Sequence, residues 1–157
     1  MSKAVDRFEE AARVTGLSVE VRRFPEGTRT APDAARAVGC HVAQIVKSLV
    51  FVADGEPFLA LTSGANRADT AKLAAALGVA DVRRADADQV REATGFAIGG
   101  TPPFGHPRPL TVLVDRDLLA YDQVWAAAGT PDAVFRLTPD DLVRASGGRV
   151  VDLAEGS

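Results

Sequence analysis

The segment 45–53 is the most strongly strand-forming part of the chain, and it limits what the chain can fold into. It is an almost unbroken run of aliphatic, β-branched and aromatic residues, a composition typical of a central strand. Asp54 and Gly55 follow, and residues 57–63 then form a second run of the same kind. An Asp-Gly pair between two such runs predicts a β-hairpin. Because side chains alternate between the two faces of a strand, both faces of this hairpin need a cover.

Short helices and strands alternate along the rest of the chain. Helix caps are recognisable at Ser2, Thr30 and Thr138, and Asp86 with Gln89 has the spacing of a capping box. The predicted helices span residues 2–15, 30–38, 69–77, 86–94 and 138–146, with helical turns at 42–44 and 117–119, and the other predicted strands span 19–24, 79–84, 110–115, 123–128, 133–137 and 149–153. Hairpins among interleaved helices and strands favour an α/β fold with a mixed sheet.

Composition excludes several classes of protein. The 157 residues are 46% hydrophobic and 25% charged, which is typical of one globular domain, and no apolar run approaches the ~20 residues of a membrane span. We therefore expect a cytoplasmic protein with no membrane partner. Cys40 is the only cysteine, and His41 and His106 are the only histidines, so we expect no disulfide, no metal and no cofactor. The net charge of −3 argues against a general nucleic-acid binder, although a local basic patch remains compatible with it.

A loop rich in glycine and proline spans residues 99–109. Gly99 and Gly100 are adjacent and without side chains, so their N–H groups can be aimed at one point and can bind an anion or a developing oxyanion. The alternative is a rigid surface crossover without a chemical role. His106, between Gly105 and Pro107, is held rigidly enough to act as an acid, a base or a donor, or simply to hold the loop together by a hydrogen bond.

Lys47 is unusual because the chain otherwise uses arginine, with Lys3 and Lys72 as its only other lysines. It shares a strand face with Leu49 and Phe51, so its amine either blunts an edge strand or projects into a partly desolvated pocket where it would attract an anion. Residues 63–69 leave a strand and enter a helix, and there Arg67 and backbone N–H groups could bind a phosphate, or the residues could form an ordinary helix cap.

Four segments together resemble one family. Residues 44–51, 61–69, 94–106 and 124–131 are similar in order and spacing to the YbaK/EbsC family of aminoacyl-tRNA deacylases, which is related to the editing insertion domain of bacterial prolyl-tRNA synthetase. The resemblance implies one compact α/β domain over residues 1–157, with a curved, barrel-like mixed sheet and surrounding helices. It also implies hydrolysis of the ester that joins a wrong amino acid to the 3′-terminal adenosine of a tRNA.

The resemblance also implies site residues. Lys47 matches the family's functional lysine, Gly99, Gly100 and Pro103 match its glycine-proline loop, and His106 matches a histidine of some branches. We expect Lys47, Gly99 and Gly100 to be catalytic, by positioning the ester and stabilising the oxyanion without a covalent intermediate. The expected substrate-binding residues are Ser63, Gly64, Asn66, Arg67, Thr101, Pro102, Pro103, Phe104, Gly105 and His106.

The implied substrate is a mischarged tRNA, with tRNA-Pro carrying Cys, Ala, Ser or Thr as the expected class and a small cavity as the sieve. Prolyl-tRNA synthetase is the expected delivery partner, and the expected state is a monomer or weak homodimer. Two alternatives belong to other classes: a non-catalytic module that binds a nucleotide or small anion on the same fold, and a regulatory partner of a synthetase.

Overall fold

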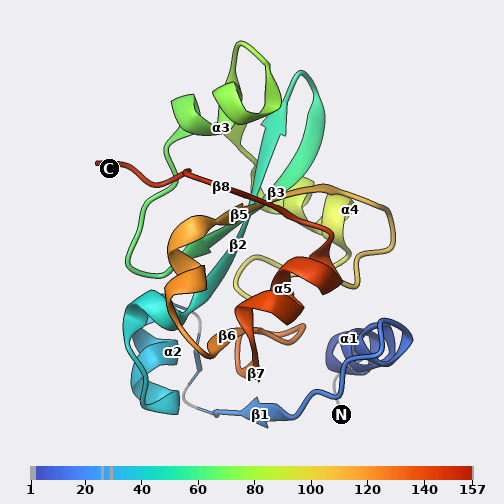
Figure 1. Ribbon diagram of the computed structural model, residues 1–157. Coiled ribbons are helices and arrows are strands. Elements are labelled where there is room, and N and C mark those ends of the chain that lie inside the picture. Colours follow the sequence, from blue (N-terminus) through green and yellow to red (C-terminus); the bar gives the residue numbers. More distant parts are fainter. Residues whose placement is uncertain (1–2, 26, 29, 157) are drawn as a thin grey trace.

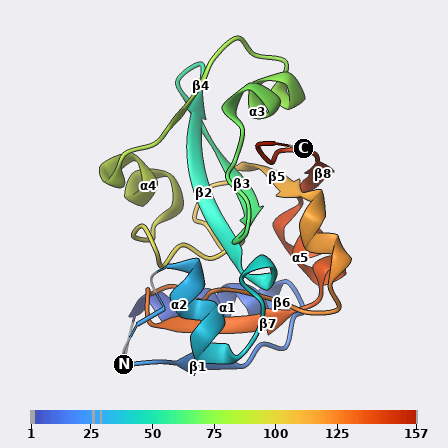
Figure 2. The same ribbon diagram turned by 90° about the vertical axis from the view of Figure 1, so that its left-hand side faces the viewer.

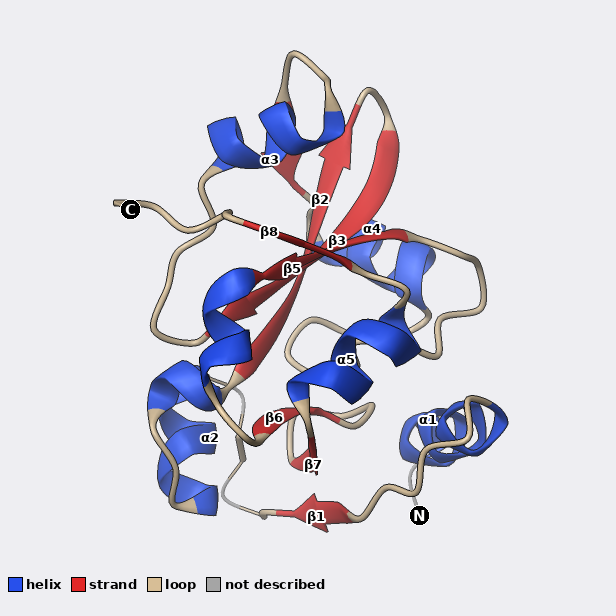
Figure 3. Cartoon of the chain, in the orientation of Figure 1, coloured by secondary structure: helices blue, strands red, loops and turns tan. Residues whose placement is uncertain are grey.

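The computed structural model describes residues 3–25, 27–28 and 30–156, and its strands form two sheets (Figure 1, Figure 3). The helices of these residues are α1 (Lys3–Val14), α2 (Ala31–Val38), α3 (Thr70–Leu77), α4 (Ala87–Thr94) and α5 (Pro139–Ser146), with short 3-10 turns η1 (Val42–Gln44) and η2 (Arg116–Ala120). The strands are β1 (Val21–Arg23), β2 (Val46–Ala53), β3 (Glu56–Ser63), β4 (Val82–Arg84), β5 (Thr111–Asp115), β6 (Val124–Ala127), β7 (Ala133–Leu137) and β8 (Arg149–Val151).

The predicted hairpin forms the centre of the larger sheet, whose strand order is β4-β2-β3-β5-β8. β2 and β3 are antiparallel and paired from Val46 with Ser63 to Ala53 with Glu56. β3 pairs with β5 in parallel, and β5 with β8 in parallel, so the sheet is mixed as predicted. β1, β7 and β6 form a separate antiparallel sheet, which an isolated bridge between Ile45 and Trp125 connects to the start of β2.

Both faces of the hairpin are covered, as its alternating pattern predicts. Figure 2 shows α4 and α3 on opposite sides of the hairpin. Val50 and Leu61 on one face join a core that includes α1, α4, α5 and the smaller sheet. Phe51 and Phe58 on the other face pack with Leu73 of α3. A third cluster lies between α2 and the smaller sheet, around Trp125 and Val134.

The helices begin at the predicted caps. The Thr30 side chain accepts a hydrogen bond from the Asp33 N–H, and Asp86 and Gln89 form the predicted capping box. Asp69 caps α3, and Thr138 caps α5. The proposed cap at Ser2 lies outside the described residues. Polar side chains that satisfy local N–H groups therefore fix where these helices start.

Three strands are shorter than predicted. β1, β4 and β8 each contain three residues, because each pairs over only three registered positions with its neighbour. The apolar pattern continues beyond them, but the pairing partner does not. The shortness of β4 matters most, because it leaves much of one edge of β2 without a strand.

The loop 99–109 contains neither helix nor strand, as its glycines and prolines predict. Phe104 anchors it in the core, with its ring centroid 5.2 Å from that of Phe8 and 5.9 Å from that of Phe135. Among the described residues, none of the helices has the length and apolar character needed to cross a membrane.

Phe8 tests this packing because its side chain is 0% exposed and contacts Phe104 and Phe135. Phe8→Ala should lower the free energy of unfolding by about 3–5 kcal/mol, because a cavity replaces the ring beneath the loop. Val14→Ala is the control, since Val14 belongs to the same helix and is 78% exposed. Denaturant titration measures both variants, and a Phe8→Ala protein as stable as Val14→Ala would contradict the packing described.

Candidate active site

A cavity of about 360 Å³ lies along the free edge of β2. β3 pairs with all of β2, whereas β4 pairs only with residues 51–53. Residues 46–50 therefore have a strand partner on one edge only, and all five line the cavity. Because the cavity follows an edge, its wall takes Val46, Ser48 and Val50 from one face of the strand and Lys47 and Leu49 from the other.

The other walls come from segments far apart in the sequence. Gly99 and Ile98 of the glycine-proline loop lie there together with Arg84 of β4 and Val90 of α4. The remaining described wall residues are Thr28, Thr30, Ala31, Pro32, Ala34, Val38, Ile45, Gly64, Ala85, Thr101, Trp125, Ala126, Ala127 and Val134. The wall is thus mostly small or apolar, with a few polar groups, which is the usual character of a small-molecule site.

Lys47 is half-buried, and its ammonium donates a hydrogen bond to the main-chain oxygen of Asn66 at 2.5 Å. Burial lowers the pKa of Lys47 below its ordinary value, and repulsion from Arg84 and Arg67 acts in the same direction, whereas Asp115 opposes it. Lys47 is therefore held in a partly desolvated position, which matches the pocket alternative considered for this residue.

The charge of the cavity wall is positive. Lys47 and Arg84 both line it, and no Asp or Glu is among its described residues. The N-terminal residues of α2, Thr30 to Pro32, also line it, and the N-terminus of a helix carries a partial positive charge. This arrangement favours an anionic or electron-rich ligand.

The two adjacent glycines differ in their surroundings. Gly99 lines the cavity with φ +87°, and its N–H has no hydrogen bond among the described residues. Gly100 is buried, and its N–H donates to the Ala97 oxygen at 3.0 Å. A Cβ on Gly100 would lie 2.8 Å from the Thr130 Cα, so this glycine allows the loop to pack on the turn between β6 and β7. Gly99 is therefore the one with an available donor.

The rest of the loop supports its start. Thr101 lines the cavity, and its hydroxyl donates to the Ala97 oxygen at 3.0 Å. Pro102, Pro103 and Phe104 are buried, and Gly105, at φ +88°, packs on α1 at Ala11. These four residues do not line the cavity.

His106 also lies outside the cavity wall. Its Nε2 is 2.8 Å from the Pro102 oxygen, so the neutral ring with a proton on Nε2 closes the loop by a hydrogen bond. Burial lowers the pKa of His106, and the Pro102 oxygen partly offsets this effect. The structure thus matches the loop-stabilising alternative considered for this residue.

The segment 63–67 lies beside Lys47. Gly64 lines the cavity, and a Cβ there would lie 2.4 Å from the Val42 oxygen. Ser63 is buried and its hydroxyl donates to the Ala43 oxygen, while both amide hydrogens of Asn66 are directed at carboxylates. The Arg67 side chain is 85% exposed and 3.6 Å from Glu155. Of the predicted site residues, Lys47, Gly64, Gly99 and Thr101 thus meet at one cavity.

Three of the wall residues that the sequence did not single out have features that suit a binding site. Arg84 follows Arg83 directly, and nothing local in the sequence distinguishes the two. Ser48 follows Lys47 directly, and its hydroxyl oxygen is buried without a hydrogen-bond partner among the described residues. Ile98 is 52% exposed although it is large and apolar, which is a signal of a binding surface once its exposure is known.

Cys40 lies away from this cavity, in a second and more open hollow beside His41 and Gln44. Its thiol donates to the His41 oxygen, and burial raises its pKa, so it is a poor nucleophile. Among the described residues, no three His, Cys, Asp or Glu side chains gather in a way that could hold a metal ion.

The His106 contact predicts a pH dependence of stability. The folded state lowers the pKa of His106, so as the pH falls through about 6.5 the unfolded chain binds a proton on this histidine before the folded chain does. The free energy of unfolding therefore decreases, by at most ~1.4 kcal/mol per pH unit. His106→Gln retains a donor for the Pro102 oxygen but takes up no proton. The fall in unfolding temperature between pH 7.5 and 5.5 should therefore be smaller in His106→Gln than in the parent, and an equal fall would refute this role.

Comparison with known proteins agrees with the fold. A profile described as aminoacyl-tRNA editing domain matches residues 25–145. YwhH of Bacillus subtilis (strain 168), an uncharacterised protein, is 31% identical over 78% of each chain. Proline--tRNA ligase of Streptococcus sanguinis (strain SK36) is 27% identical over 99% of this chain, which spans only 25% of the ligase. The crystal structure of a candidate trans-editing enzyme for prolyl tRNA synthetase has a TM-score of 0.94 and 48% identity, covering 99% of both chains. The chain therefore belongs to the aminoacyl-tRNA editing domain family, the YbaK family related to the editing domain of prolyl-tRNA synthetase.

Proposed function

We propose that the protein hydrolyses the ester of a mischarged aminoacyl-tRNA. The observation that carries the proposal is the single cavity shared by the Lys47 side chain and Gly99, in a member of the editing-domain family. One group supplies positive charge and the other supplies a free N–H, which are the two requirements for holding and cleaving an aminoacyl ester at the end of an RNA.

The terminal nucleotide would be bound by charge. Lys47, Arg84 and the N-terminus of α2 surround the cavity without a described carboxylate, so a phosphate of the RNA end can lie among them. Only the 3′ end of the tRNA needs to enter the cavity. This explains how a chain with a net charge of −3 can act on RNA at one positively charged site.

The chemistry would need no protein nucleophile. Water adds to the ester carbonyl carbon, and the Gly99 N–H stabilises the negative oxygen that forms. The bond from this carbon to the ribose oxygen then breaks, and that oxygen takes the proton lost by the water. The described wall has no Cys, His, Asp or Glu to act as a base, so the neighbouring ribose hydroxyl of the substrate is the group that relays the proton.

The wall would act as a sieve for the amino acid. Val46, Val50, Val90 and Ile98 leave an apolar space, which distinguishes side chains by size at only ~1–3 kcal/mol per methylene. Small side chains such as those of Cys, Ala, Ser and Thr fit this requirement. The similarity to a proline--tRNA ligase and to a candidate trans-editing enzyme supports tRNA-Pro as the carrier.

The protein would work in the cytoplasm with prolyl-tRNA synthetase as its delivery partner. The similarity to part of a proline--tRNA ligase supports that partner, since both would act on the same tRNA. Adding prolyl-tRNA synthetase should then raise the deacylation rate at low enzyme concentration. An unchanged rate over a titration of the synthetase would refute this partner.

The competing function is a non-catalytic module that holds a nucleotide or small anion in the same cavity. The positive wall favours it, since Lys47 and Arg84 would bind such a ligand equally well. The Gly99 N–H could donate to a bound anion as well as to an oxyanion, so only turnover of an ester distinguishes the two functions.

A panel of mischarged tRNAs tests the proposal. The protein should release the amino acid from at least one ester, and Lys47→Met should lower kcat/KM by ~100-fold or more, because the positioning charge is lost. Lys72→Met is the matched control: Lys72 is also partly buried, but its hydrogen bonds are to Asp152 and Ala154, away from the cavity. Its activity should stay within about twofold of the parent.

Two outcomes would contradict the proposal. Tight binding of the tRNA 3′ end without turnover of any ester would favour the non-catalytic module. Full activity of Lys47→Met would remove Lys47 from the mechanism.

A further inference from the structure

The Lys47 ammonium is held by a carbonyl whose own position is unusually constrained. Lys47 Nζ donates to the Asn66 main-chain oxygen at 2.5 Å. An ammonium has three donors, so this contact fixes its direction and leaves donors for a ligand. The position of the Lys47 ammonium then depends on the groups that hold the Asn66 carbonyl in place.

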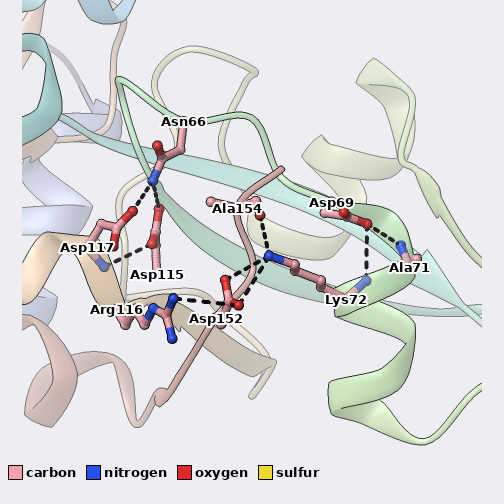
Figure 4. A network of polar contacts seen from close by, with 9 residues as sticks. All are labelled: Asn66, Asp69, Ala71, Lys72, Asp115, Arg116, Asp117, Asp152 and Ala154. Carbon is pink, nitrogen blue, oxygen red and sulfur yellow. Dashed lines mark hydrogen bonds and ion pairs between the residues drawn. The ribbon is translucent and has the colours of Figure 1, made fainter. Parts of the chain in front are cut away.

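The Asn66 side chain is clamped by two carboxylates (Figure 4). Its Nδ2 donates to Asp115 Oδ2 at 2.9 Å and to Asp117 Oδ2 at 2.8 Å, so both amide hydrogens are used. Asp115 is 1% exposed, and its oxygens also accept the N–H groups of Ser63 and Asp117, each at 3.0 Å. A buried carboxylate that accepts this many hydrogen bonds has one well-defined position. Its hydrogen bond therefore also fixes the position of the Asn66 side chain.

The start of the segment 63–67 is hydrogen-bonded to residues at the start of β2. Ser63 pairs with Val46, the residue before Lys47. The Gly64 N–H donates to the Ile45 oxygen at 2.7 Å, and Gly64 is packed too closely for any side chain. The backbone of Lys47 and the Asn66 carbonyl that accepts its hydrogen bond are thus held in fixed positions relative to each other.

Three charged groups also act on the Lys47 ammonium. Arg84 on β4 and Arg67 on the loop repel the ammonium, while Asp115 at the end of β5 attracts it. Without the carbonyl, the flexible side chain would turn away from the two guanidinium groups and lose its fixed direction.

We propose that Asn66 is a positioning residue for Lys47, and that the Asp115 and Asp117 carboxylates set its carbonyl through the side-chain amide. The inference rests on the proposed role of Lys47 in deacylation. It assigns Asn66 a supporting role in place of direct contact with the substrate, because its amide hydrogens are already bonded.

Asn66→Ala tests the proposal against a purely structural role. It should lower kcat by about tenfold with less than twofold change in KM, because the substrate still binds but the ammonium is misdirected. In a Lys47→Met background the same change should cost less than twofold, since there is no ammonium left to position. Equal losses in both backgrounds would overturn the inference.

A second measurement does not depend on activity. Acetylation of Lys47 by acetic anhydride, followed by mass spectrometry of the peptide, should be severalfold faster in Asn66→Ala than in the parent, because the carbonyl of residue 66 is no longer held in place and its hydrogen bond to the amine opens more often. Asp117→Ala, which removes only the exposed acceptor, should give a smaller increase. Asp152→Ala, in the neighbouring part of the same polar network, should give none.

The outcomes separate the two proposals. If the parent cleaves esters and Lys47→Met does not, while Asn66→Ala retains full activity and the parent's labelling rate, the positioning role is wrong and the proposed function stands. If no ester is cleaved, the proposed function is wrong, and the labelling rates alone decide whether Asn66 holds Lys47.

Discussion

The unequal pairing of β2 determines where the cavity lies. β3 satisfies one edge of the strand over its full length, but β4 reaches only its last three positions. The Ala85 N–H bonds to the Val50 oxygen, so by the alternation of an antiparallel ladder the peptide groups of Ser48 and Val46 face the same edge. Such groups are costly to bury without partners, and the cavity beside them gives them access to water or ligand. The stable hairpin and the open site are thus two consequences of one pairing pattern.

Much of the fold could be predicted because its signals are local. The Asp54-Gly55 turn, the capping box at Asp86 and the cap at Thr138 each involve residues within a few positions of one another. The alternation along β2 predicted two covered faces, and separate cores occupy them. The predicted lengths of β1, β4 and β8 were wrong, because a strand ends where its pairing partner ends, and that partner is distant in the sequence.

The site was less predictable because the residues that reach the cavity are of the same amino-acid type as neighbours that do not, and only their packing distinguishes them. Gly99 and Gly100 are identical in sequence terms, yet contact with Thr130 buries one and the turn at Ala97 occupies its N–H. Arg83 and Arg84 are also adjacent, and only the pairing of β4 with β2 directs Arg84 to the cavity. The segments that carry the family resemblance contribute Lys47, Gly64, Gly99 and Thr101 to one cavity, whereas which residues of each segment reach it depends on contacts between residues tens of positions apart.

Net charge was a poor guide to this site for a physical reason. Many acidic residues of the chain are committed locally: Asp69 and Asp86 cap helices, and Asp33 and Asp141 pair with arginines one turn away. Their fields are screened by solvent within about 10 Å. Lys47 and Arg84 act at shorter range in a partly desolvated cavity, where screening is weak. A chain that is acidic as a whole can therefore present a positively charged cavity, and in the proposed function the affinity for an RNA end would depend on the charge of that cavity rather than on the net charge of the chain.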